Sequence, residues 1–421
     1  MTATPSVVVV GGGFAGLHVA KALAKRPVKV TLVDRTNHHL FQPMLYQIAT
    51  AALSPGDIAT PIRSILRRAK NVEVLLGEVA RVDVAARAIE LTDGSRVGYD
   101  YLALAPGARH SYFGKPDWEE LAPGLKSLED AIEIRRRVLT AFERAEREPE
   151  PVARQRLLTF VVIGGGPTGV ELAGALAEIR KFALRRDFRR IDSRDATVML
   201  LEGGPRLLPS YPPELSDRAK EALRHLGVDV RTETLVTSVE PGYVHAADWR
   251  IPAATVIWAA GNAASPLLAS LGVPLDRQGR VFVEPDCSIP GHREVFVLGD
   301  AAAFGPQPGR PAVPGVCPAA IQMGQYAAAA IEADLTGETR RPFRYRDKGQ
   351  LAVIGRGRGV ADIGRFETAG FVAWFLWVFV HIFFLIGFRN RVLVMFEWAW
   401  SYFTFERGAR LITGGWRANG S

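Results

Sequence analysis

A glycine-rich turn between a strand and a helix occurs twice in the chain, and this repeat constrains the fold more than any other feature. Residues 7–34 read as a strand, the turn "GGGFAG", a helix and a strand ending in Asp34. Residues 160–202 repeat this order with the turn "GGGPTG" and end in Glu202. A G-x-G-x-x-G turn inside a strand–helix–strand unit is typical of dinucleotide-binding folds. We therefore predict an α/β protein with two Rossmann-like domains.

In the first turn the three motif glycines are Gly11, Gly13 and Gly16. The first permits the tight turn, the second lets the backbone approach a pyrophosphate, and the third lets helix and strand pack closely. The helix N-terminus then faces the phosphate charge, and Asp34 accepts hydrogen bonds from a ribose. Glycines at such a turn can be merely structural, but the flanking strand, helix and acid together favour a binding site.

The second turn contains Gly164, Gly166 and Gly169, and Glu202 ends the strand that follows. This acid lies beyond the usual distance of ~20 residues, because the segment "RKFALRRDFRRIDSRDA" lengthens the connection. A carboxylate here binds a ribose 2′-hydroxyl and repels a 2′-phosphate, which favours NADH, although Arg206 nearby leaves NADPH open. Two such units and a later "LGD" favour two dinucleotides held face to face, with FAD in the first and NADH in the second.

The order of these patterns predicts a chain that visits the first domain, then the second, then the first again. A charged segment at 130–156 reads as the first crossover, and the strand pattern at 294–300 as the return. The expected parts are the first part of the FAD-binding domain (1–130), the NADH-binding domain with linkers (131–285), the second part of the FAD-binding domain (286–345) and a C-terminal helical membrane-docking module (346–421).

Charge and cysteine content exclude several classes of protein. The net charge is +8, but no segment alternates basic and aromatic residues as a nucleic-acid groove does, so we expect anionic ligands or an anionic membrane surface instead. Cys287 and Cys317 are the only cysteines. Without a CxxC motif or a ligand cluster, neither a disulfide framework nor a metal site is expected, and both cysteines read as small core residues. The opening "MTATPS" leaves no room for a signal peptide.

With these motifs in place, the sequence resembles the two-dinucleotide-binding-domain flavoproteins over residues 6–335. It resembles the type II NADH:quinone oxidoreductases nearly to its end. The motifs that carry the resemblance are "NHHLFQPMLYQIATAALSPGDIATPIR", "LALAPGA", "GGGPTGVELAG", "WAAGN", "VFVLGDAA", "CPAAIQMGQYAA" and "DKGQLAVIGR". Disulfide reductases carry a cysteine pair after the first turn, and sulfide:quinone oxidoreductases need thiols; this sequence has neither.

The resemblance implies hydride transfer from NADH to non-covalent FAD, then delivery of two electrons to a membrane quinone without proton pumping, in a homodimer. The residues that it and the turns assign to FAD are Gly11, Gly13, Phe14, Ala15, Gly16, Asp34, Arg35, Pro43, Leu45, Val79, Ala105, Gly107, Gly299, Asp300 and Gln322. The residues assigned to NADH are Gly164, Gly166, Pro167, Thr168, Gly169, Glu171, Glu202, Ala260 and Gly261.

The resemblance also implies a quinone site, and here the sequence departs from the family. The family segment A-Q-x-A-x-Q-Q corresponds to residues 317–323, where proline and methionine replace two glutamines. Hydrogen bonding to the quinone carbonyl must therefore be thinner than in the family or come from elsewhere. The residues expected to bind quinone are Pro318, Ala319, Gln322, Lys348 and Leu351. The residues expected to be catalytic are Glu171, Gln322 and Lys348.

Each of these assignments has a structural alternative. Segment 317–323 also reads as an Ala-rich helix packed on the FAD domain, and Lys348 as a surface lysine. Burial of Glu171 near the cofactor rings would raise its pKa and suit proton handling. The same acid also complements the dipole of a helix N-terminus.

The stretch Gly370–Phe388 is apolar except for His381. As one helix it would be roughly 28 Å long, close to the hydrocarbon thickness of a bilayer. The following segment is interrupted by Glu397, arginines flank the stretch on both sides, and aromatic residues recur. These features favour an amphipathic module that lies in the membrane interface. A transmembrane span is a weaker alternative, and a helix buried in a soluble core or a dimer interface is weaker still. We therefore expect a peripheral, monotopic protein on the cytoplasmic face of the cell membrane.

Two other functions remain compatible with the turns. One is a soluble reductase that passes electrons to a protein or small-molecule acceptor, as ferredoxin reductases do; the apolar tail disfavours it. The other is a membrane-bound FAD- and NAD-binding signalling protein, which only a turnover measurement distinguishes from the enzyme.

Overall fold

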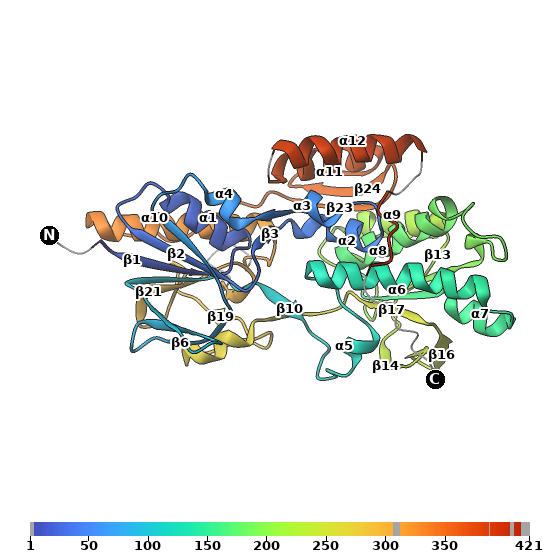
Figure 1. The fold of residues 1–421 in the computed structure, drawn as a ribbon, viewed down its shortest axis with the longest axis horizontal. Helices are drawn as coiled ribbons and strands as arrows, with labels where there is room; N and C mark the ends of the chain where they lie inside the picture. The colour runs from blue at the N-terminus through green and yellow to red at the C-terminus, as the bar shows by residue number, and fades with distance from the viewer. Residues whose placement is uncertain (1–3, 306–311, 387, 405–407, 414–421) are drawn as a thin grey trace. The chain divides into compact units, whose positions relative to one another are not determined.

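Three separate segments of the chain form each of two structural units in the computed structural model (Figure 1). The structure describes residues 4–305, 312–386, 388–404 and 408–413. The first unit contains Met1–Leu40, Ala59–Arg109 and Asn262–Lys348, and the second contains Phe41–Ile58, His110–Gly261 and Gly349–Ser421. The boundaries differ from those expected: 41–58 and 110–130 group with the second unit and 262–285 with the first. One reason is that helix α2 (Leu45–Ala49) packs on helices of the second unit.

The first unit is organised around a six-stranded sheet in the order β20-β21-β9-β1-β2-β5. Its central strand β1 (Ser6–Val10) is a run of valines paired in parallel with β2 (Lys29–Asp34) on one side and β9 (Tyr101–Leu104) on the other. Strands buried on both faces have such continuous apolar sequences. Helix α1 (Phe14–Leu23) packs against α10 (Cys317–Thr336) on one face of the sheet (Figure 1).

The other elements of the first unit include the remaining strands of this sheet. They are β3 (His38–Leu40), β4 (Ala59–Pro61), α4 (Ile62–Leu66), β5 (Val72–Leu76), β6 (Val79–Asp83), β7 (Ala88–Leu91), β8 (Arg96–Gly98), β10 (Ala108–His110), β18 (Asn262–Ala264), η4 (Pro266–Leu271), β19 (Val281–Phe282), β20 (Ser288–Ile289), β21 (His292–Val297), η5 (Gly299–Ala301) and β22 (Ala302–Ala303). The return strand expected at 294–300 is β21, which pairs with β9 in parallel and ends at Val297.

The second unit has a four-stranded parallel sheet in the order β13-β12-β11-β17. Its central strand β11 (Thr159–Ile163) is buried at every position and leads into the second glycine turn and helix α8 (Pro167–Glu178). The other elements up to residue 258 are η1 (Gln42–Met44), α2, α3 (Pro55–Ile58), α5 (Trp118–Leu121), α6 (Leu128–Arg147), α7 (Pro151–Leu157), η2 (Ile179–Ala183), η3 (Ser193–Asp195), β12 (Thr197–Leu201), α9 (Pro213–Leu226), β13 (Val228–Arg231), β14 (Val236–Glu240), β15 (Tyr243–Ala246), β16 (Trp249–Pro252) and β17 (Thr255–Trp258).

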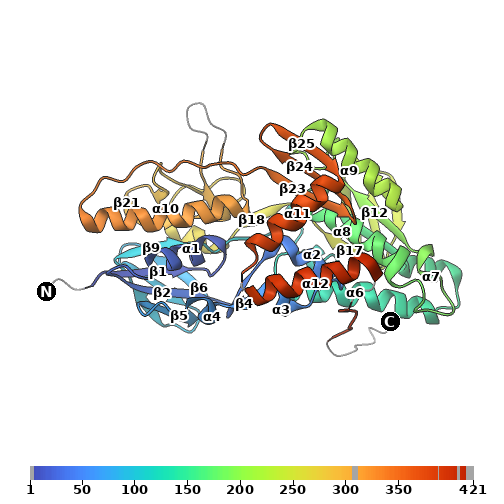
Figure 2. The same cartoon turned by 90° about the horizontal axis from the view of Figure 1, so that it is seen from above.

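The C-terminal part of the second unit begins with a sheet, so the expectation of a purely helical module was incomplete. Strands β23 (Gln350–Gly355), β24 (Arg358–Ile363) and β25 (Phe366–Gly370) form an antiparallel meander. Gly357 and Gly364 adopt positive φ angles in its two turns, a conformation that favours glycine. Helix α11 (Phe371–Phe384) follows and packs on this sheet, and α12 (Phe388–Thr404) comes next and contacts α11 and α3 (Figure 2).

The apolar stretch Gly370–Phe388 is not one helix. Helix α11 ends at Phe384, where Leu385 takes an extended conformation, and α12 starts at Phe388. Fourteen residues give a helix of about 21 Å, short of the ~30 Å of a bilayer's hydrocarbon core. Among the described helices none is both long and apolar enough to cross a membrane.

Candidate active site

The first glycine turn has the geometry that a pyrophosphate site requires. Gly11 has a φ of +97°, and a Cβ atom on Gly16 would overlap the carbonyl oxygen of Gly11. A Cβ atom on Gly13, by contrast, would meet nothing within 4 Å. Helix α1 begins there without a side-chain cap and without an acid in its first turn. The turn therefore leaves open space and unshielded backbone donors for an anion.

Asp34 reaches this turn from the end of β2. Its Oδ2 accepts the N–H of Gly12 at 2.5 Å, and its Oδ1 accepts the N–H of Thr36 at 2.6 Å and the hydroxyl of Thr36 at 2.8 Å. A carboxylate accepts about four hydrogen bonds, so capacity remains for a ribose hydroxyl. These features fit the adenosine and pyrophosphate half of a dinucleotide such as FAD.

The second turn reproduces this arrangement in the second unit. Gly164 has a φ of +111°, and a Cβ atom on Gly169 would overlap the carbonyl oxygen of Gly164. Glu202 Oε2 accepts the N–H of Gly165 at 2.5 Å. A Cβ atom on Gly166 would again meet nothing within 4 Å. The long connection before Glu202 thus leaves the acid at the position expected from the sequence.

The surroundings of Glu202 favour a free 2′-hydroxyl on the nucleotide. Its Oε1 accepts the N–H of Gly204 at 2.6 Å, so two of about four acceptor positions are used. Arg206, which left NADPH open, donates instead to the carbonyl of Pro209 at 2.8 Å. The charge placed directly against the second turn is the negative charge of Glu202.

The other residues expected to bind FAD divide between the two units. Pro43 and Leu45 belong to the second unit, and the rest belong to the first. Gly107 has a φ of +70° and borders open space. Asp300 is half-buried in η5, and within the described residues its carboxylate has no hydrogen-bonding partner. Arg35 is exposed, and Val79 lies at the start of β6.

The residues expected around the quinone divide between the two units. Gln322 uses both ends of its amide on the backbone of Arg346, with distances of 2.9 Å for each bond. Lys348 is exposed in the same unit. Pro318 lies in the first turn of α10 and Ala319 is buried. Leu351, in β23, belongs to the other unit.

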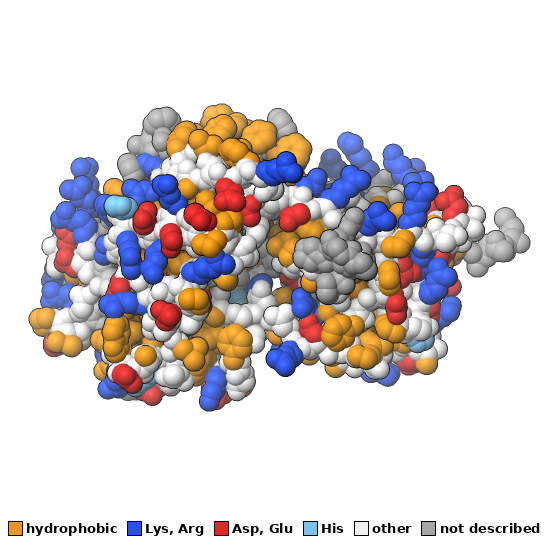
Figure 3. All heavy atoms as spheres, turned by 180° about the vertical axis from the view of Figure 1, so that it is seen from behind, with side chains coloured by type: hydrophobic (Ala, Val, Ile, Leu, Met, Phe, Trp, Pro, Cys, Tyr) orange, Lys and Arg blue, Asp and Glu red, His pale blue; other side chains and the backbone are white. Residues whose placement is uncertain are grey.

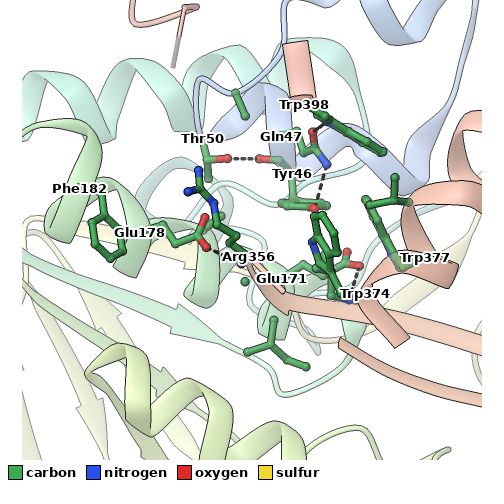
Figure 4. Close-up of a pocket in the computed structure, with 16 residues that line it drawn as sticks. Tyr46, Gln47, Thr50, Glu171, Glu178, Phe182, Arg356, Trp374, Trp377 and Trp398 are labelled. Atoms are coloured by element: carbon green, nitrogen blue, oxygen red, sulfur yellow. Dashed lines mark hydrogen bonds between the residues drawn. The ribbon is translucent and has the colours of Figure 1, made fainter. Parts of the chain in front are cut away.

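A pocket of about 120 Å³ lies within the second unit, beneath α11 and α12 (Figure 4). Trp374 and Trp377 of α11 and Trp398 of α12 contribute aromatic walls. The residues that line it from other elements include Tyr46, Gln47, Thr50, Glu171, Glu178, Phe182, Val353 and Arg356. The pocket combines a largely aromatic wall with a few polar groups, as small-molecule sites do.

Glu171 is the buried acid of this pocket. It is 8 % exposed on α8, and its Oε1 accepts the N–H of Val353 at 3.5 Å. Burial raises the pKa of Glu171 to about 8, against smaller lowering effects of that N–H and of the Trp377 indole. The indole N–H adjoins the carboxyl without reaching hydrogen-bonding geometry. Glu171 is therefore protonated at neutral pH.

The outer side of α11 and α12 is apolar and exposed. Phe371, Phe375, Phe379 and Phe383 recur at every fourth position of α11 and are each more than half exposed. Phe396 and Trp400 of α12 are also exposed, and Figure 3 shows a hydrophobic patch at the top of the molecule, where the C-terminal helices lie. On the inner side, His381 stacks on Trp377, and burial lowers the pKa of His381 to about 4. The one ionisable residue of the apolar stretch is thus neutral.

Sequence reasoning missed several site residues. His39, 1 % exposed in β3, contacts the carbonyl of Gly12 through Nδ1 at 2.9 Å. Gln47, Trp377 and Trp398 meet at the pocket although they lie far apart in the sequence. The motif "NHHLFQPMLYQ" places polar side chains among apolar ones, and a polar side chain that becomes buried needs a hydrogen-bonding partner. The sequence does not identify that partner.

Two Rossmann sheets, each with a glycine turn and an acid at the next strand end, define a flavoprotein oxidoreductase that uses pyridine nucleotides. Residues 5–324 match the family described as pyridine nucleotide-disulphide oxidoreductase, and residues 348–407 match the NDH2 C-terminal domain. Within that class the chain belongs to the type II NADH:quinone oxidoreductases. It is 44% identical to the type II NADH:quinone oxidoreductase Ndh of Mycobacterium tuberculosis, over 97% of this chain and 90% of that protein.

Other comparisons agree with this assignment. The type II NADH:quinone oxidoreductase of Staphylococcus haemolyticus is 29% identical over 88% of this chain and 92% of its own length. The solved structure of NDH2 from Plasmodium falciparum in complex with NADH has the same fold. It has a TM-score of 0.90 at 19% identity, and the match covers 98% of this chain and 100% of that one.

Proposed function

We propose that this protein oxidises NADH and passes two electrons through bound FAD to a membrane quinone, without moving protons across the membrane. Family membership supports the reaction. The observation that carries the acceptor half is the pocket in the second unit, where a protonated Glu171 lies among tryptophans of the C-terminal helices.

The chain's own residues bind and orient the two dinucleotides. The Gly11–Gly16 turn and Asp34 hold FAD, and the Gly164–Gly169 turn and Glu202 hold NADH. When bound, FAD would accept a hydride and pass on two electrons. The carboxylate of Glu202 makes NADH the preferred donor, because a 2′-phosphate would bring two negative charges together.

The pocket beneath α11 and α12 is the proposed access route of the quinone. Pro43 and Leu45, which the resemblance assigns to FAD, directly precede the pocket residues Tyr46 and Gln47 in the chain. Glu171 Oε1 accepts the backbone N–H of Val353, so Oε2 is the oxygen that carries the proton. Donation of that proton to the reduced quinone would return Glu171 to its charged form, which its burial disfavours.

The aromatic face of α11 and α12 is the proposed membrane contact. Phenylalanine and tryptophan side chains enter the boundary between headgroups and acyl chains, where an amphipathic helix lies in plane. The net charge of +8 favours an anionic surface such as the cytoplasmic leaflet of the cell membrane. We also propose a homodimer whose interface includes the C-terminal helices. The mass of the FAD-loaded protein in solution tests this.

NADH oxidation by the FAD-loaded protein tests the function, with a water-soluble quinone and a lipid-embedded quinone as parallel acceptors and NADPH as a second donor. We expect turnover with both quinones and a clear preference for NADH. Replacing Phe375 and Phe379 together by serine should slow only the reaction with lipid-embedded quinone. Rapid flavin reduction by NADH without reoxidation by any quinone would contradict the proposal and favour a soluble-type reductase or a signalling protein.

A further inference from the structure

The indole N–H of Trp377 is a buried donor that forms no hydrogen bond within the described residues. Trp377 lies on α11, is 2 % exposed and lines the pocket. A buried N–H group without a partner costs free energy, so each such group in a folded protein calls for an explanation. Here the N–H remains available to an acceptor in the pocket.

Three aromatic side chains restrict this indole. His381 stacks on it with 4.0 Å between ring centroids, and the rings of Tyr46 and Trp398 lie at 6.2 Å and 5.4 Å. His381 is itself held, because its Nδ1 donates to the carbonyl of Trp377 at 2.7 Å. An indole N–H donates in the plane of its ring, so a ring stacked above it cannot accept the bond. Packing therefore fixes the direction of the N–H.

The group beside this N–H is the carboxyl of Glu171. Figure 4 shows Glu171 and Trp377 on the same side of the pocket. In the resting protein Glu171 is neutral, and the indole N–H adjoins its carboxyl outside hydrogen-bonding geometry. Hydrogen bonds to an ionised acceptor are shorter and about twice as strong as those to a neutral one. The N–H therefore becomes a strong donor only when Glu171 is ionised.

We propose that Trp377 donates a hydrogen bond to the carboxylate that Glu171 becomes when it gives a proton to quinone, and that Trp377 is a positioning residue for this step. The inference rests on the proposed function. Reduction of a quinone to a quinol takes up two electrons and two protons. The hydride of NADH supplies both electrons and one proton, and the other proton comes from solvent through Glu171. In that step the O–H bond at Oε2 breaks, an O–H bond forms at the quinone oxygen, and the negative charge stays on Glu171 until solvent returns a proton.

The carboxylate left by this step needs more than one donor. A buried charge is costly unless it is hydrogen-bonded, and the backbone N–H of Val353, at 3.5 Å, is a weak partner. A donor already aimed at the place where charge develops stabilises it with little reorganisation. The N–H of Trp377 is such a donor, so α11 contributes to the chemistry of the pocket as well as to the proposed membrane contact.

Trp377→Phe tests the inference, because phenylalanine keeps an aromatic ring and removes the N–H. Loss of one hydrogen bond to a charged group corresponds to about tenfold in rate and about one pH unit in a titration. Reoxidation of the reduced flavin by saturating water-soluble quinone should therefore be about tenfold slower at pH 7. The decline of this rate at high pH should move upward by about one pH unit, and flavin reduction by NADH should match the wild type.

A titration of Glu171 by infrared spectroscopy needs no turnover. The C=O band of its protonated carboxyl, identified by its absence from Glu171→Gln, is followed against pH in the oxidised, FAD-loaded protein. In Trp377→Phe the loss of this band should move upward by about one pH unit. Trp249→Phe, at an exposed position of β16 outside the pocket, is the matched control and should titrate like the wild type.

A double-mutant cycle separates this role from a structural one. If Trp377 acts through Glu171, then Trp377→Phe in the Glu171→Gln background should change the reoxidation rate by less than about twofold. An equal loss in both backgrounds would mean that the indole only maintains the pocket, and would overturn the inference. A raised KM for quinone with an unmoved pH profile would overturn it too, because the N–H would then contact the quinone instead.

Other titratable or charged groups around the pocket contribute to the same pH profiles. They are Tyr46 on α2, Asp57 on α3, Glu178 on α8, Tyr211 before α9, Arg356 after β23, Asp362 on β24, His381 on α11 and Glu397 on α12. The Glu171→Gln background retains all of them. A pH dependence that they cause would persist there, whereas the shift assigned to Trp377 must be absent.

Because Trp377→Phe leaves a cavity, a second variant removes the N–H alone. Replacement of Trp377 by benzothienylalanine keeps the bicyclic ring and puts sulfur in place of the N–H. It should reproduce the shifted titration of Glu171 with a melting temperature near wild type, and it decides the question if Trp377→Phe does not fold; an unmoved titration would overturn the inference. Failure of the proposed function looks different, since the wild type would then reduce its flavin without reducing any quinone.

Discussion

In the first unit the glycine turn at 11–16 is held by polar groups of its own sheet, whereas the helix that follows the turn at 164–169 packs on the C-terminal sheet. Asp34 makes three hydrogen bonds around the first turn, and His39 contacts the carbonyl of Gly12. In the second unit a Cβ atom on Gly174 of α8 would overlap the carbonyl of Ile354 in β23. That close approach leaves Glu171 against Val353.

The difference indicates two kinds of dinucleotide site. Helix α1 packs on α10, β1, β2 and β9 of its own unit, which suits retention of a cofactor through many turnovers. The second turn opens a helix that continues to the pocket, so in the proposed function the element that binds NADH also contributes an acid, Glu171, to the quinone site. Disturbing the two turns in parallel is therefore the most direct test of the comparison.

The largest effect is expected from Gly16→Ala and Gly169→Ala. In each case the added methyl group would overlap the carbonyl oxygen of the first glycine in the turn, so the turn must open. We expect Gly16→Ala to purify without FAD. Gly169→Ala should retain FAD but be reduced by NADH at least ~100-fold more slowly at a fixed NADH concentration, the free-energy equivalent of about 2.7 kcal/mol.

Flavin absorbance of the purified protein and stopped-flow reduction measure the two outcomes. Gly98→Ala is the control, because its added methyl group would meet only the carbonyl of Arg87, at 3.8 Å. Equal loss of FAD in both glycine variants would mean that the two turns do not act separately, contrary to the comparison.

Glu171→Gln tests the acid that distinguishes the second unit. Proton transfer by a placed side chain contributes about 10²- to 10⁴-fold, so quinone reduction should fall by about 100-fold at pH 7 while flavin reduction by NADH stays within about twofold. In the wild type the quinone rate should decline above pH 8, where Glu171 loses its proton. The glutamine variant should lack that decline, and a wild-type profile in the variant would contradict the role.

Stability gives an independent test of the same group. The pKa of Glu171 is raised by burial to about 8 from an ordinary value of 4.5. Between these pH values the folded state holds a proton that the unfolded state has released, so wild-type stability falls as the pH rises. Glu171→Gln should remove this slope, and its melting temperature relative to the wild type should increase from pH 5 to pH 8. Parallel curves would show that the acid is not buried in solution.

The sequence predicted those parts of the site that are formed by residues close together in the chain. The turns and Asp34 follow from spacing, and Glu202 follows from its position at the end of the next strand pattern, because a strand–helix–strand unit brings its glycines and its terminal acid to one edge of the sheet. Glu171 was predicted with an alternative role at a helix N-terminus, and the burial that raises its pKa depends on β23, which lies about 180 residues away in the chain.

What the sequence did not predict depends on distant contacts. Trp398 and Gln47 are 351 residues apart, and neither has a local pattern that pairs them. The strands β23–β25 were read as part of a helical module, although Gly357 and Gly364 marked their turns. The break after Phe384 is not marked by a proline, and Gly387 is the nearest signal for it in the sequence.

A smaller effect is expected from Glu202→Ser, which removes the acid of the second turn. Its two backbone bonds, to Gly165 and Gly204, would be lost, together with the proposed bond to the ribose. A hydrogen bond to a charged group contributes about 1.5–3 kcal/mol, so the KM for NADH should rise about tenfold or more. The KM for NADPH should change less, which narrows the preference. Glu214→Ser, at an exposed position of α9, serves as the control, and an unchanged ratio of the two KM values would contradict the assignment.

The smallest effect is expected from His39 in the first unit, and it would show how this turn is held. Because the carbonyl of Gly12 can only accept, Nδ1 of His39 must carry the hydrogen. Burial lowers the pKa of His39 to about 4, so the ring is neutral and keeps this tautomer above pH 5. His39→Ala should weaken FAD binding about three- to tenfold, the value of one neutral hydrogen bond, and His39→Asn should restore part of it because its amide also donates. Release of fluorescent FAD on dilution measures the dissociation rate, with His38→Ala as the neighbouring control, since that ring contacts the side chain of Asn37 instead. If His39→Ala kept the wild-type FAD dissociation rate while His38→Ala changed it, the first turn would be held by Asp34 without help from His39, and the two turns would be more alike than their surroundings indicate.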